Sequence, residues 1–255
     1  MAIDEDRFIA PLPDLVVLKN SAGVFYEMFN YYGEEFSRHF GLMFEKYVGV
    51  VLMHSVRTAK LISEDVIRQT YPPEKGKVPD WIIIEGDIAI LIECKATRFS
   101  RAAIASGTEE HVKDSLKQVI KGLRQLASFR EACMAKAPGL EVLHKCKIFK
   151  PLLTSLEPLY LINSTFFREF LDGELSSSMG VMNLPWYILS LDELERLQPY
   201  LAKGLGVGSL LNELQNQSCS DLIVKPEKQS GLTFKDSFLY EVSQDLYRRL
   251  GVPMP

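Results

Sequence analysis

Two carboxylates and a lysine border a pair of apolar runs in the sequence PDWIIIEGDIAILIECKA. Asp80 precedes the first run, and Glu93 and Lys95 end the second. Carboxylate oxygens are the ligands that Mg²⁺ and Mn²⁺ prefer in proteins. A bound divalent ion can lower the pKa of a water and stabilise charge on a phosphate, and a nearby ammonium can orient that water. These residue types indicate metal-dependent phosphoryl chemistry if the fold brings them together.

The turn between the two runs decides whether the side chains meet. Residues 86–87 (GD) predict a two-residue hairpin turn of the Gly-X kind. The register of such a hairpin places Asp80 opposite Glu93, with their Cβ atoms roughly 5 Å apart. Lys95 lies two residues further along and shares their face of the sheet. A three-residue turn would shift Asp80 by one residue and separate the carboxylates.

The same three charges also permit a purely structural interpretation. The runs 82–84 and 88–92 are apolar on both faces, which indicates central strands of a covered sheet. Unpaired charges at the ends of such strands would be costly, so they need a partner of opposite sign. That partner is either a divalent ion or Lys95 alone, in a salt bridge at the mouth of the strands. A short motif does not decide between the two.

The elements around the hairpin predict an α/β core. Helical spacing predicts a helix over 31–54 that is apolar nearly all round beyond Gly41 and is therefore buried. A second, longer helix is expected over 109–136. Alternation and β-branched residues predict strands at 65–71 and 146–154. With the hairpin, the order becomes helix, three strands, helix, strand.

The C-terminal third predicts a smaller set of elements. Residues 161–170 are expected to hold a short strand and a helix, and 186–191 another strand. The sequence SLDE at 190–193 is a capping box that opens a helix to about residue 201. Residues 236–250 have the spacing of an amphipathic helix. Three closely spaced glycines lack the Gly-Lys-Ser/Thr sequence of a phosphate loop, so they indicate a loop or a helix end: Gly204, Gly206 and Gly208.

Residues 79–80 (PD) and 93–95 (ECK) resemble the two motifs of the PD-(D/E)xK nuclease superfamily, which has the restriction-endonuclease-like fold. The resemblance implies a core of helix, three strands, helix and strand, with a mixed central sheet flanked by helices. It covers residues 33–155. Residues 1–32 would be an N-terminal lead-in, and 156–255 an α/β extension packed on the core.

The resemblance also implies roles for individual residues. Asp80, Glu93 and the backbone carbonyl of Cys94 would bind Mg²⁺ or Mn²⁺, and Lys95 would position the attacking water. Glu45, on the first core helix, would bind the ion directly or through water. Its own setting agrees, because a lone acid in an apolar helix needs a partner. The alternative for Glu45 is pairing with a neighbouring lysine at the helix surface.

The helix after the second motif offers candidate substrate contacts. Gln118 resembles a polar position that many family members carry, and Lys117 and Lys121 flank it at a spacing from which they could reach phosphate. An ordinary solvated helix face explains the lysines equally well. Residues 95–150 hold 12 Lys/Arg and 5 Asp/Glu, within a chain whose net charge is −4. This basic segment is compatible with one anion-facing surface.

These features predict a metal-dependent phosphodiesterase that hydrolyses nucleic acid, DNA before RNA. The alternative within the same fold is a catalytically inactive module for nucleic-acid binding or protein assembly. It is favoured by the acidic net charge and by the C-terminal third, to which the sequence assigns no role. A third interpretation keeps the α/β fold outside the family, with the charges as a buried ion pair. A homodimer or a protein partner could use the C-terminal part.

Composition limits the setting in which the chain works. It has 255 residues, 47% hydrophobic and 24% charged, which is typical of a globular protein. No run of about 18 apolar residues is present, so we expect no membrane partner. The start MAIDEDRFIAPLPD lacks the apolar segment of a secretory signal. Four scattered cysteines without a CxxC pair favour reduced thiols. We therefore expect a cytoplasmic protein.

Overall fold

The structure is a computed structural model, and the residues that it describes are 2–4, 7–8, 22–97, 109–157, 165–179, 185–214 and 231–251. The chain divides into two compact units, Met1–Met43 and Phe44–Pro255. The first unit contains an antiparallel pair of short strands, β1 (Ala2–Asp4) and β2 (Arg7–Phe8), and the beginning of helix α2 (Ala22–Ser55). Helix α2 continues into the second unit, and its full range includes the predicted helix 31–54.

Helix α2 bends at Gly33 within the first unit. Gly33 has φ 58° and ψ −132°, a conformation that only glycine adopts readily. Across the bend, the ring of Phe25 lies 5.3 Å from that of Phe36 and 4.9 Å from that of Phe40, centroid to centroid. The bend therefore folds two aromatic segments of one helix against each other.

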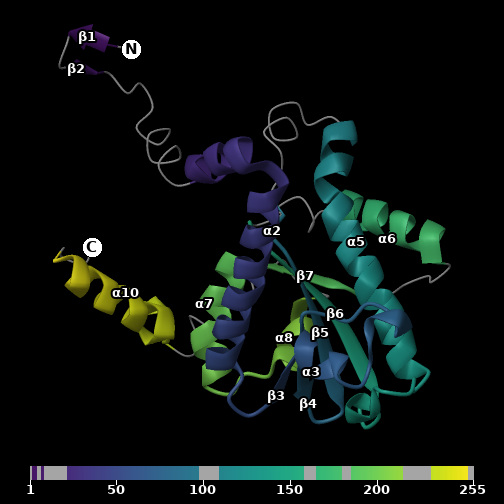
Figure 1. Ribbon diagram of the computed structural model, residues 1–255. Helices are drawn as coiled ribbons and strands as arrows, with labels where there is room; N and C mark the ends of the chain where they lie inside the picture. Colours follow the sequence, from purple (N-terminus) through teal and green to yellow (C-terminus); the bar gives the residue numbers. More distant parts are fainter. Residues whose placement is uncertain are drawn as a thin grey trace. The chain divides into compact units, whose positions relative to one another are not determined.

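A five-stranded mixed sheet organises the second unit (Figure 1). Strands β3, β4 and β5 are antiparallel, and β5, β6 and β7 are parallel. The spatial order follows the sequence: β3 (Lys60–Ser63), β4 (Trp81–Glu85), β5 (Ile88–Lys95), β6 (Ile148–Ser155) and β7 (Tyr187–Ser190). This confirms an α/β fold with a mixed sheet, to which the C-terminal third contributes the edge strand β7.

The hairpin of β4 and β5 has the expected register. Trp81 pairs with Ile92 and Glu85 with Ile88, so the connection is the predicted two-residue turn. Gly86 has φ 61° whereas Asp87 has a negative φ. A positive φ at the first turn residue alone is the pattern of a type II′ turn, which requires glycine there.

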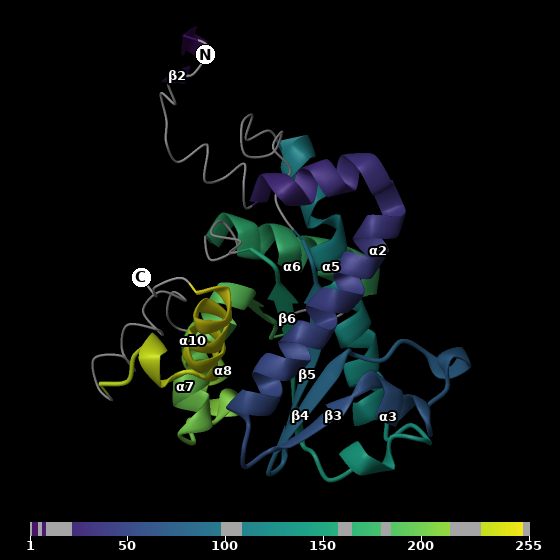
Figure 2. The same cartoon turned by 60° about the vertical axis from the view of Figure 1, so that its left-hand side comes forward.

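Helices cover both faces of the sheet (Figure 2). One face packs against α3 (Glu64–Arg68), α5 (Glu109–Met134) and α6 (Thr165–Met179). The other face packs against residues 44–55 of α2, α7 (Leu191–Ala202) and α8 (Val207–Leu214). Helix α10 (Phe238–Leu250) follows near the C-terminus. Short 3₁₀ segments lie at Pro73–Lys75, Glu141–Leu143 and Phe234–Asp236.

Most predicted elements of the C-terminal third are present. Strand β7 and helix α10 match the predictions for 186–191 and 236–250. The Ser190 hydroxyl accepts from the Glu193 N–H while the Glu193 carboxylate accepts from the Ser190 N–H, which confirms the capping box of α7. Of the elements expected over 161–170, residues 161–164 lie outside the described residues, and α6 begins at Thr165.

The predicted strand at 65–71 is wrong. The first core strand is β3, and residues 64–68 form α3 (Figure 1). Ser63 occupies the N-cap position, and Glu64 and Asp65 lie in the first turn, where acidic side chains favour the positive end of a helix. Ile67 is buried, so the short helix buries the isoleucine whose alternation with polar residues suggested a strand. The predicted order of helix, three strands, helix and strand is still present, with α3 as an additional helix after the first strand.

The prediction that α2 is buried all round beyond Gly41 is also wrong. Val48 and Leu52 are buried, but Val50 and Met53 are 37% and 58% exposed. Only one stripe of the helix contacts the sheet, and hydrophobic side chains also occupy its other side. Within the described ranges, no helix has the length and apolar character needed to cross a membrane.

The cysteines that the structure describes are free thiols: Cys94, Cys133 and Cys146. Burial raises the pKa of the Cys133 thiol to about 12, so this side chain stays protonated at neutral pH. Cys219 lies outside the described residues.

Candidate functional site

Asp80, Glu93 and Lys95 lie together at one end of the β4–β5 hairpin. Glu93 Oε1 accepts a hydrogen bond from Lys95 Nζ at 2.5 Å. Asp80 Oδ2 accepts from the backbone N–H of Cys94 at 2.6 Å, so this side chain reaches across to β5. The β4–β5 register ends at the pair of Trp81 with Ile92, and Asp80 and Glu93 are the next residues along the two segments. The hairpin therefore brings the two carboxylates and the lysine together.

Glu93 has an oxygen without a partner. The side chain is 2% exposed, and Oε2 is buried with no hydrogen bond in the described part of the chain. Leaving a buried polar atom unsatisfied costs about 1–3 kcal/mol, more for a charged group. Such an atom in a folded protein calls for an explanation, and an ion or a bound water is the usual one. Glu93 is thus built to accept one more ligand.

The electrostatics of the site favour protons or cations. Burial first, and then the charge of Asp80, raise the pKa of Glu93 to about 7, while Lys95 acts in the opposite direction. Burial also raises the pKa of Asp80, against the stabilising hydrogen bond from Cys94. Two ionised carboxylates in a poorly solvated place repel each other. Lys95 alone does not offset the effect of burial, because both pKa values remain raised.

Glu45 approaches the same cluster from α2. Trp81 Nε1 donates to the Glu45 backbone carbonyl at 3.1 Å, and the Trp81 ring lies where a Cβ on Gly49 would come within 2.1 Å. The absence of a side chain at Gly49 therefore lets α2 approach β4 closely. Burial, followed by the charge of Asp80, raises the pKa of Glu45 to about 7. The proposed surface pairing with a lysine does not relieve this shift, although the neighbouring Lys46 lowers it slightly.

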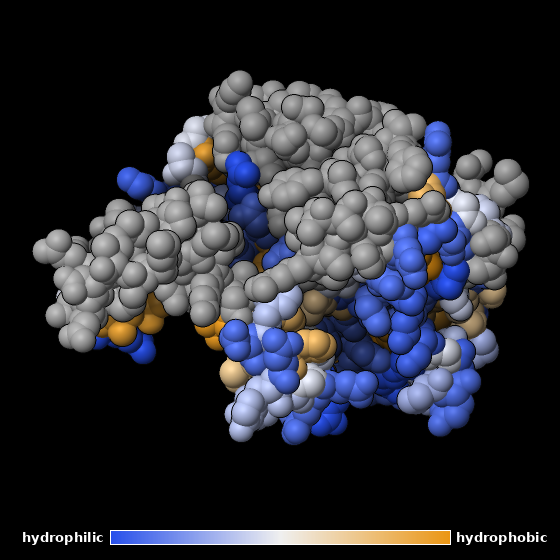
Figure 3. Space-filling model, turned by 90° about the horizontal axis from the view of Figure 1, so that it is seen from above, coloured by the Kyte–Doolittle hydropathy of each residue, from blue (hydrophilic) through white to orange (hydrophobic). Residues whose placement is uncertain are grey.

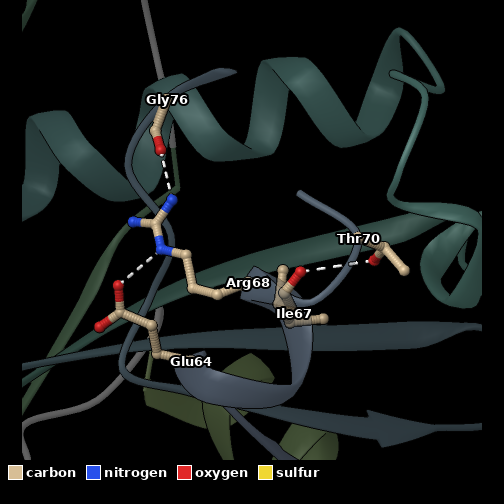
Figure 4. Close-up of polar contacts among 5 residues, drawn as sticks. All are labelled: Glu64, Ile67, Arg68, Thr70 and Gly76. Carbon is tan, nitrogen blue, oxygen red and sulfur yellow. Dashed lines mark hydrogen bonds and ion pairs between the residues drawn. The ribbon is translucent and has the colours of Figure 1, made fainter. Parts of the chain in front are cut away.

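Glu64 is a fourth carboxylate of the cluster, which the sequence did not predict. Its charge contributes to the raised pKa values of Glu45, Asp80 and Glu93. Glu64 N–H donates to the Asp80 backbone carbonyl at 2.9 Å. Figure 4 shows its carboxylate held by Arg68 Nε at 2.9 Å, while Arg68 also donates to the carbonyl of Gly76. Arg68 thus pairs with Glu64, whereas Lys95 pairs with Glu93.

Helix α5 covers the cluster through Gly122. A Cβ at this position would meet Leu153 Cδ1 at 2.8 Å, Lys95 Cε at 3.2 Å and Glu93 Cγ at 3.3 Å. The helix can pack on the charged end of β5 only because residue 122 has no side chain. Gln118 is exposed and lies four residues before Gly122. Residues four apart share one side of a helix, so Gln118 lies on the same side of α5 as Gly122.

The predicted lysines are on the solvent side of α5. Lys121 is exposed, and Lys117 forms an ion pair with Asp114 at 2.7 Å, with 72% of the lysine side chain exposed. The structure does not bring either lysine into contact with the carboxylates. In the view of Figure 3, hydrophilic residues make up most of the surface that the described residues contribute, with smaller apolar areas between them.

Cys94 has the orientation expected from strand alternation. Its side chain packs with the cluster of the opposite face of the sheet, and burial raises the pKa of its thiol well above the usual value. Cys94 nevertheless contacts Asp80, because its backbone N–H donates to Asp80 Oδ2 and a side-chain hydrogen bond with Asp80 adds to the raised pKa of the thiol. The proposed role of its carbonyl as a metal ligand stays a prediction.

The residues present fit a magnesium-type ion with incomplete protein coordination. Within the ranges that the structure describes, no three His, Cys, Asp or Glu side chains form a ready-made metal cluster. Mg²⁺ usually keeps several waters and takes only one or two carboxylates from the protein. Asp80 and Glu93 would supply those two, with the unpartnered Glu93 Oε2 as the most available oxygen.

Comparison of this chain with protein-family models, with curated proteins and with solved structures found no match. The case for a function therefore depends on the geometry of the cluster itself.

Sequence reasoning missed three residues that shape the site: Glu64, Gly122 and Gly49. A glycine inside a long helix is costly relative to alanine, so Gly122 and Gly49 were signals of close packing. Glu64 gave a weaker signal, because its place next to Asp80 depends on the correct position of β3.

Proposed function

We propose that the chain is a metal-dependent nuclease in which Asp80 and Glu93 hold Mg²⁺ or Mn²⁺. The observation that carries this proposal is the buried, unpartnered Oε2 of Glu93 beside a second, half-buried carboxylate. Raised pKa values at both carboxylates support it, because a bound divalent cation would stabilise the ionised forms that burial disfavours. Such perturbed groups are typical of functional sites.

The remaining side chains have chemically distinct roles in this proposal. When bound, the divalent ion supplies Lewis-acid chemistry that makes a water more acidic and stabilises phosphate charge. Lys95 Nζ, fixed by Glu93 Oε1, donates a hydrogen bond that orients a water or a phosphate oxygen. Glu45, with a pKa of about 7, can accept a proton at its carboxylate near neutral pH. Gln118 would contact the substrate backbone.

The substrate that we propose is nucleic acid, with DNA tested before RNA. A phosphodiester gives the ion and Lys95 the negatively charged oxygens that they require. The basic segment 95–150 would supply longer-range attraction for a polyanion.

A plasmid and oligonucleotide cleavage assay tests the proposal. Wild type, Asp80→Asn and Asp87→Asn are compared with Mg²⁺, with Mn²⁺ and with EDTA. Asp87 lies at the exposed opposite end of the same hairpin, so its variant is a matched control. We expect metal-dependent cleavage by wild type and Asp87→Asn, and at least about a hundredfold loss in Asp80→Asn.

A second measurement separates inactivity from a wrong substrate. Binding of Mn²⁺ is followed by the loss of its free electron paramagnetic resonance signal. Mn²⁺ binding without cleavage of DNA or RNA would retain the metal site and remove the nuclease activity. Absence of both Mn²⁺ binding and cleavage would overturn the proposal and favour the catalytically inactive module of the same fold.

A further inference from the structure

A second candidate site lies at the other end of the sheet, where β7 falls short of β6. Strand β6 begins at Ile148, but the first of its residues to pair with β7 is Leu152, which lies opposite Tyr187. Next to the start of β6, on the side that β7 does not reach, is a cavity of about 320 Å³. Such a volume is in the range of small-molecule sites. The cavity is lined by residues of α5, β6, β7 and α8: Arg130, Met134, Lys147, Ile148, Phe149, Lys150, Pro185, Tyr187 and Asn212.

The lining carries three cationic side chains and no acidic one. Lys150 is buried and already engaged, because its Nζ donates to the Gly208 carbonyl at 3.0 Å and to the Asn212 side-chain oxygen. Arg130 is different, since its Nε is buried and has no hydrogen-bond partner in the described part of the chain. Lys147 is exposed, and no described carboxylate pairs with it. Two cations therefore face the cavity without a counter-ion.

The remaining walls are apolar. Met134 and Ile148 are 58% and 47% exposed, and Pro185 and Phe149 complete an apolar surface beside the cations. A guanidinium offers parallel N–H donors that match phosphate or carboxylate oxygens, and a lysine adds a point charge. A phosphomonoester carries a charge of about −1.5 to −2 at neutral pH, which Arg130 and Lys147 together would balance.

We propose that this cavity, named here the Arg130 pocket, binds a small phosphomonoester with an apolar or aromatic body. Arg130 and Lys147 hold the phosphate, and the apolar wall holds the body. The pocket is separate from the carboxylate cluster. Ile148 pairs with Ile88 at the start of β5, whereas Lys95 ends the same strand seven residues later, roughly 23 Å away. The two sites can therefore be tested independently.

Isothermal titration calorimetry with three probes tests this proposal. The probes are adenosine monophosphate, phenyl phosphate and, as the uncharged body, adenosine. All titrations contain EDTA, so they do not depend on the proposed metal site. For the two phosphate esters we expect a Kd below about 1 mM, and at least about tenfold weaker binding of adenosine.

Two substitutions and a matched control locate the binding. Lys147→Gln and Arg130→Gln should each weaken adenosine monophosphate binding about tenfold or more. Lys145→Gln removes an equally exposed lysine two residues away, outside the lining, and should bind as wild type does. Because Lys147 is exposed, its variant should fold even if Arg130→Gln does not. The proposal is wrong if neither phosphate ester binds, or if Lys147→Gln binds with wild-type affinity.

Discussion

Two glutamates at opposite ends of one hairpin show how differently the fold treats the same side chain. Glu85 ends β4, and both of its oxygens are satisfied: Oε1 accepts from the Val207 N–H and Oε2 from the Gly208 N–H, each at 2.9 Å. Glu93 lies near the end of β5 with one oxygen bound to Lys95 and the other without a partner. Glu85 therefore closes the first turn of α8, whereas Glu93 has coordination capacity left over.

The difference lies in the geometry of the donors. The first turn of a helix presents unpaired N–H groups and a positive dipole end, which suit a carboxylate with no other partner. Gly208 allows the approach, because a Cβ there would lie 3.2 Å from Glu85 Oε2 and 3.1 Å from Ile88 Cδ1. At the other end, Glu93 has Asp80 as a neighbour and only one ammonium. A fully satisfied carboxylate holds the fold together, and an incompletely satisfied one is a candidate ligand.

The comparison predicts opposite stability effects, the largest at Glu85. Glu85→Ala should lower the free energy of unfolding by about 4 kcal/mol, because it removes two charge-assisted hydrogen bonds and leaves donors of α8 unpaired. Chemical denaturation with urea measures this change. Asp87→Ala, two residues away on the exposed turn, should stay within about 0.5 kcal/mol of wild type. A loss below about 1 kcal/mol in Glu85→Ala would mean that the cap contributes little.

At Glu93, by contrast, removing the carboxylate should stabilise the protein above neutral pH. The raised pKa means that the folded state binds a proton more tightly than the unfolded state. Its contribution to stability is therefore lost as pH rises from about 4.5 to about 7. Glu93→Gln removes this loss. In EDTA, its advantage over wild type should grow from near zero at pH 4.5 to about 3 kcal/mol at pH 8.

Urea denaturation across that pH range, with Glu131→Gln as an exposed control on α5, checks the prediction. Mn²⁺ should then stabilise wild type at pH 8 and leave Glu93→Gln unchanged. A variant that is less stable than wild type at pH 8 without metal would show that the Lys95 ion pair outweighs the repulsion from Asp80.

The contrast also explains how far the sequence could reach. The hairpin register was predictable, because a Gly-Asp sequence between two apolar runs favours a two-residue turn, which sets the pairing of the strands. Register then fixed Asp80, Glu93 and Lys95 as neighbours. The capping box of α7 was predictable for a similar reason, since its hydrogen bonds join residues three positions apart.

Contacts between distant segments were beyond that reasoning. Glu85 looked like an ordinary turn-flanking charge, and its partners lie more than 120 positions away in α8. The strand assigned to 65–71 failed because a single helical turn and a strand can bury the same isoleucine, and Ser63 with Glu64 and Asp65 tips the choice toward the helix. The same error hid Glu64, because its place beside Asp80 follows from the short helix that replaces the predicted strand.

A smaller effect is expected at Gly122, where α5 crosses the Glu93 end. Gly122→Ala should destabilise by about 1 kcal/mol, because overpacking against Leu153, Lys95 and Glu93 exceeds the gain in helix propensity. Gly173→Ala in α6 is a matched control with nothing near its Cβ, and it should stabilise slightly. Thermal denaturation compares the two. We also expect Gly122→Ala to weaken Mn²⁺ binding, which Gly173→Ala should leave intact. Equal stability gains in both variants would show that α5 yields freely at this point.

The smallest stability effect is expected at Lys117, and this makes the residue informative. Its ion pair with Asp114 is exposed, so Lys117→Ala should leave the free energy of unfolding close to that of wild type. If α5 carries DNA phosphates past the Glu93 end, the same variant should bind an oligonucleotide more weakly, and the salt dependence of binding should fall by about one ion. Lys145→Ala, near the Glu85 end, should alter neither quantity. Fluorescence anisotropy at several salt concentrations distinguishes the outcomes. An unchanged salt slope in Lys117→Ala would confine any nucleic-acid surface to other residues, because a lysine that meets a phosphate must release a counter-ion.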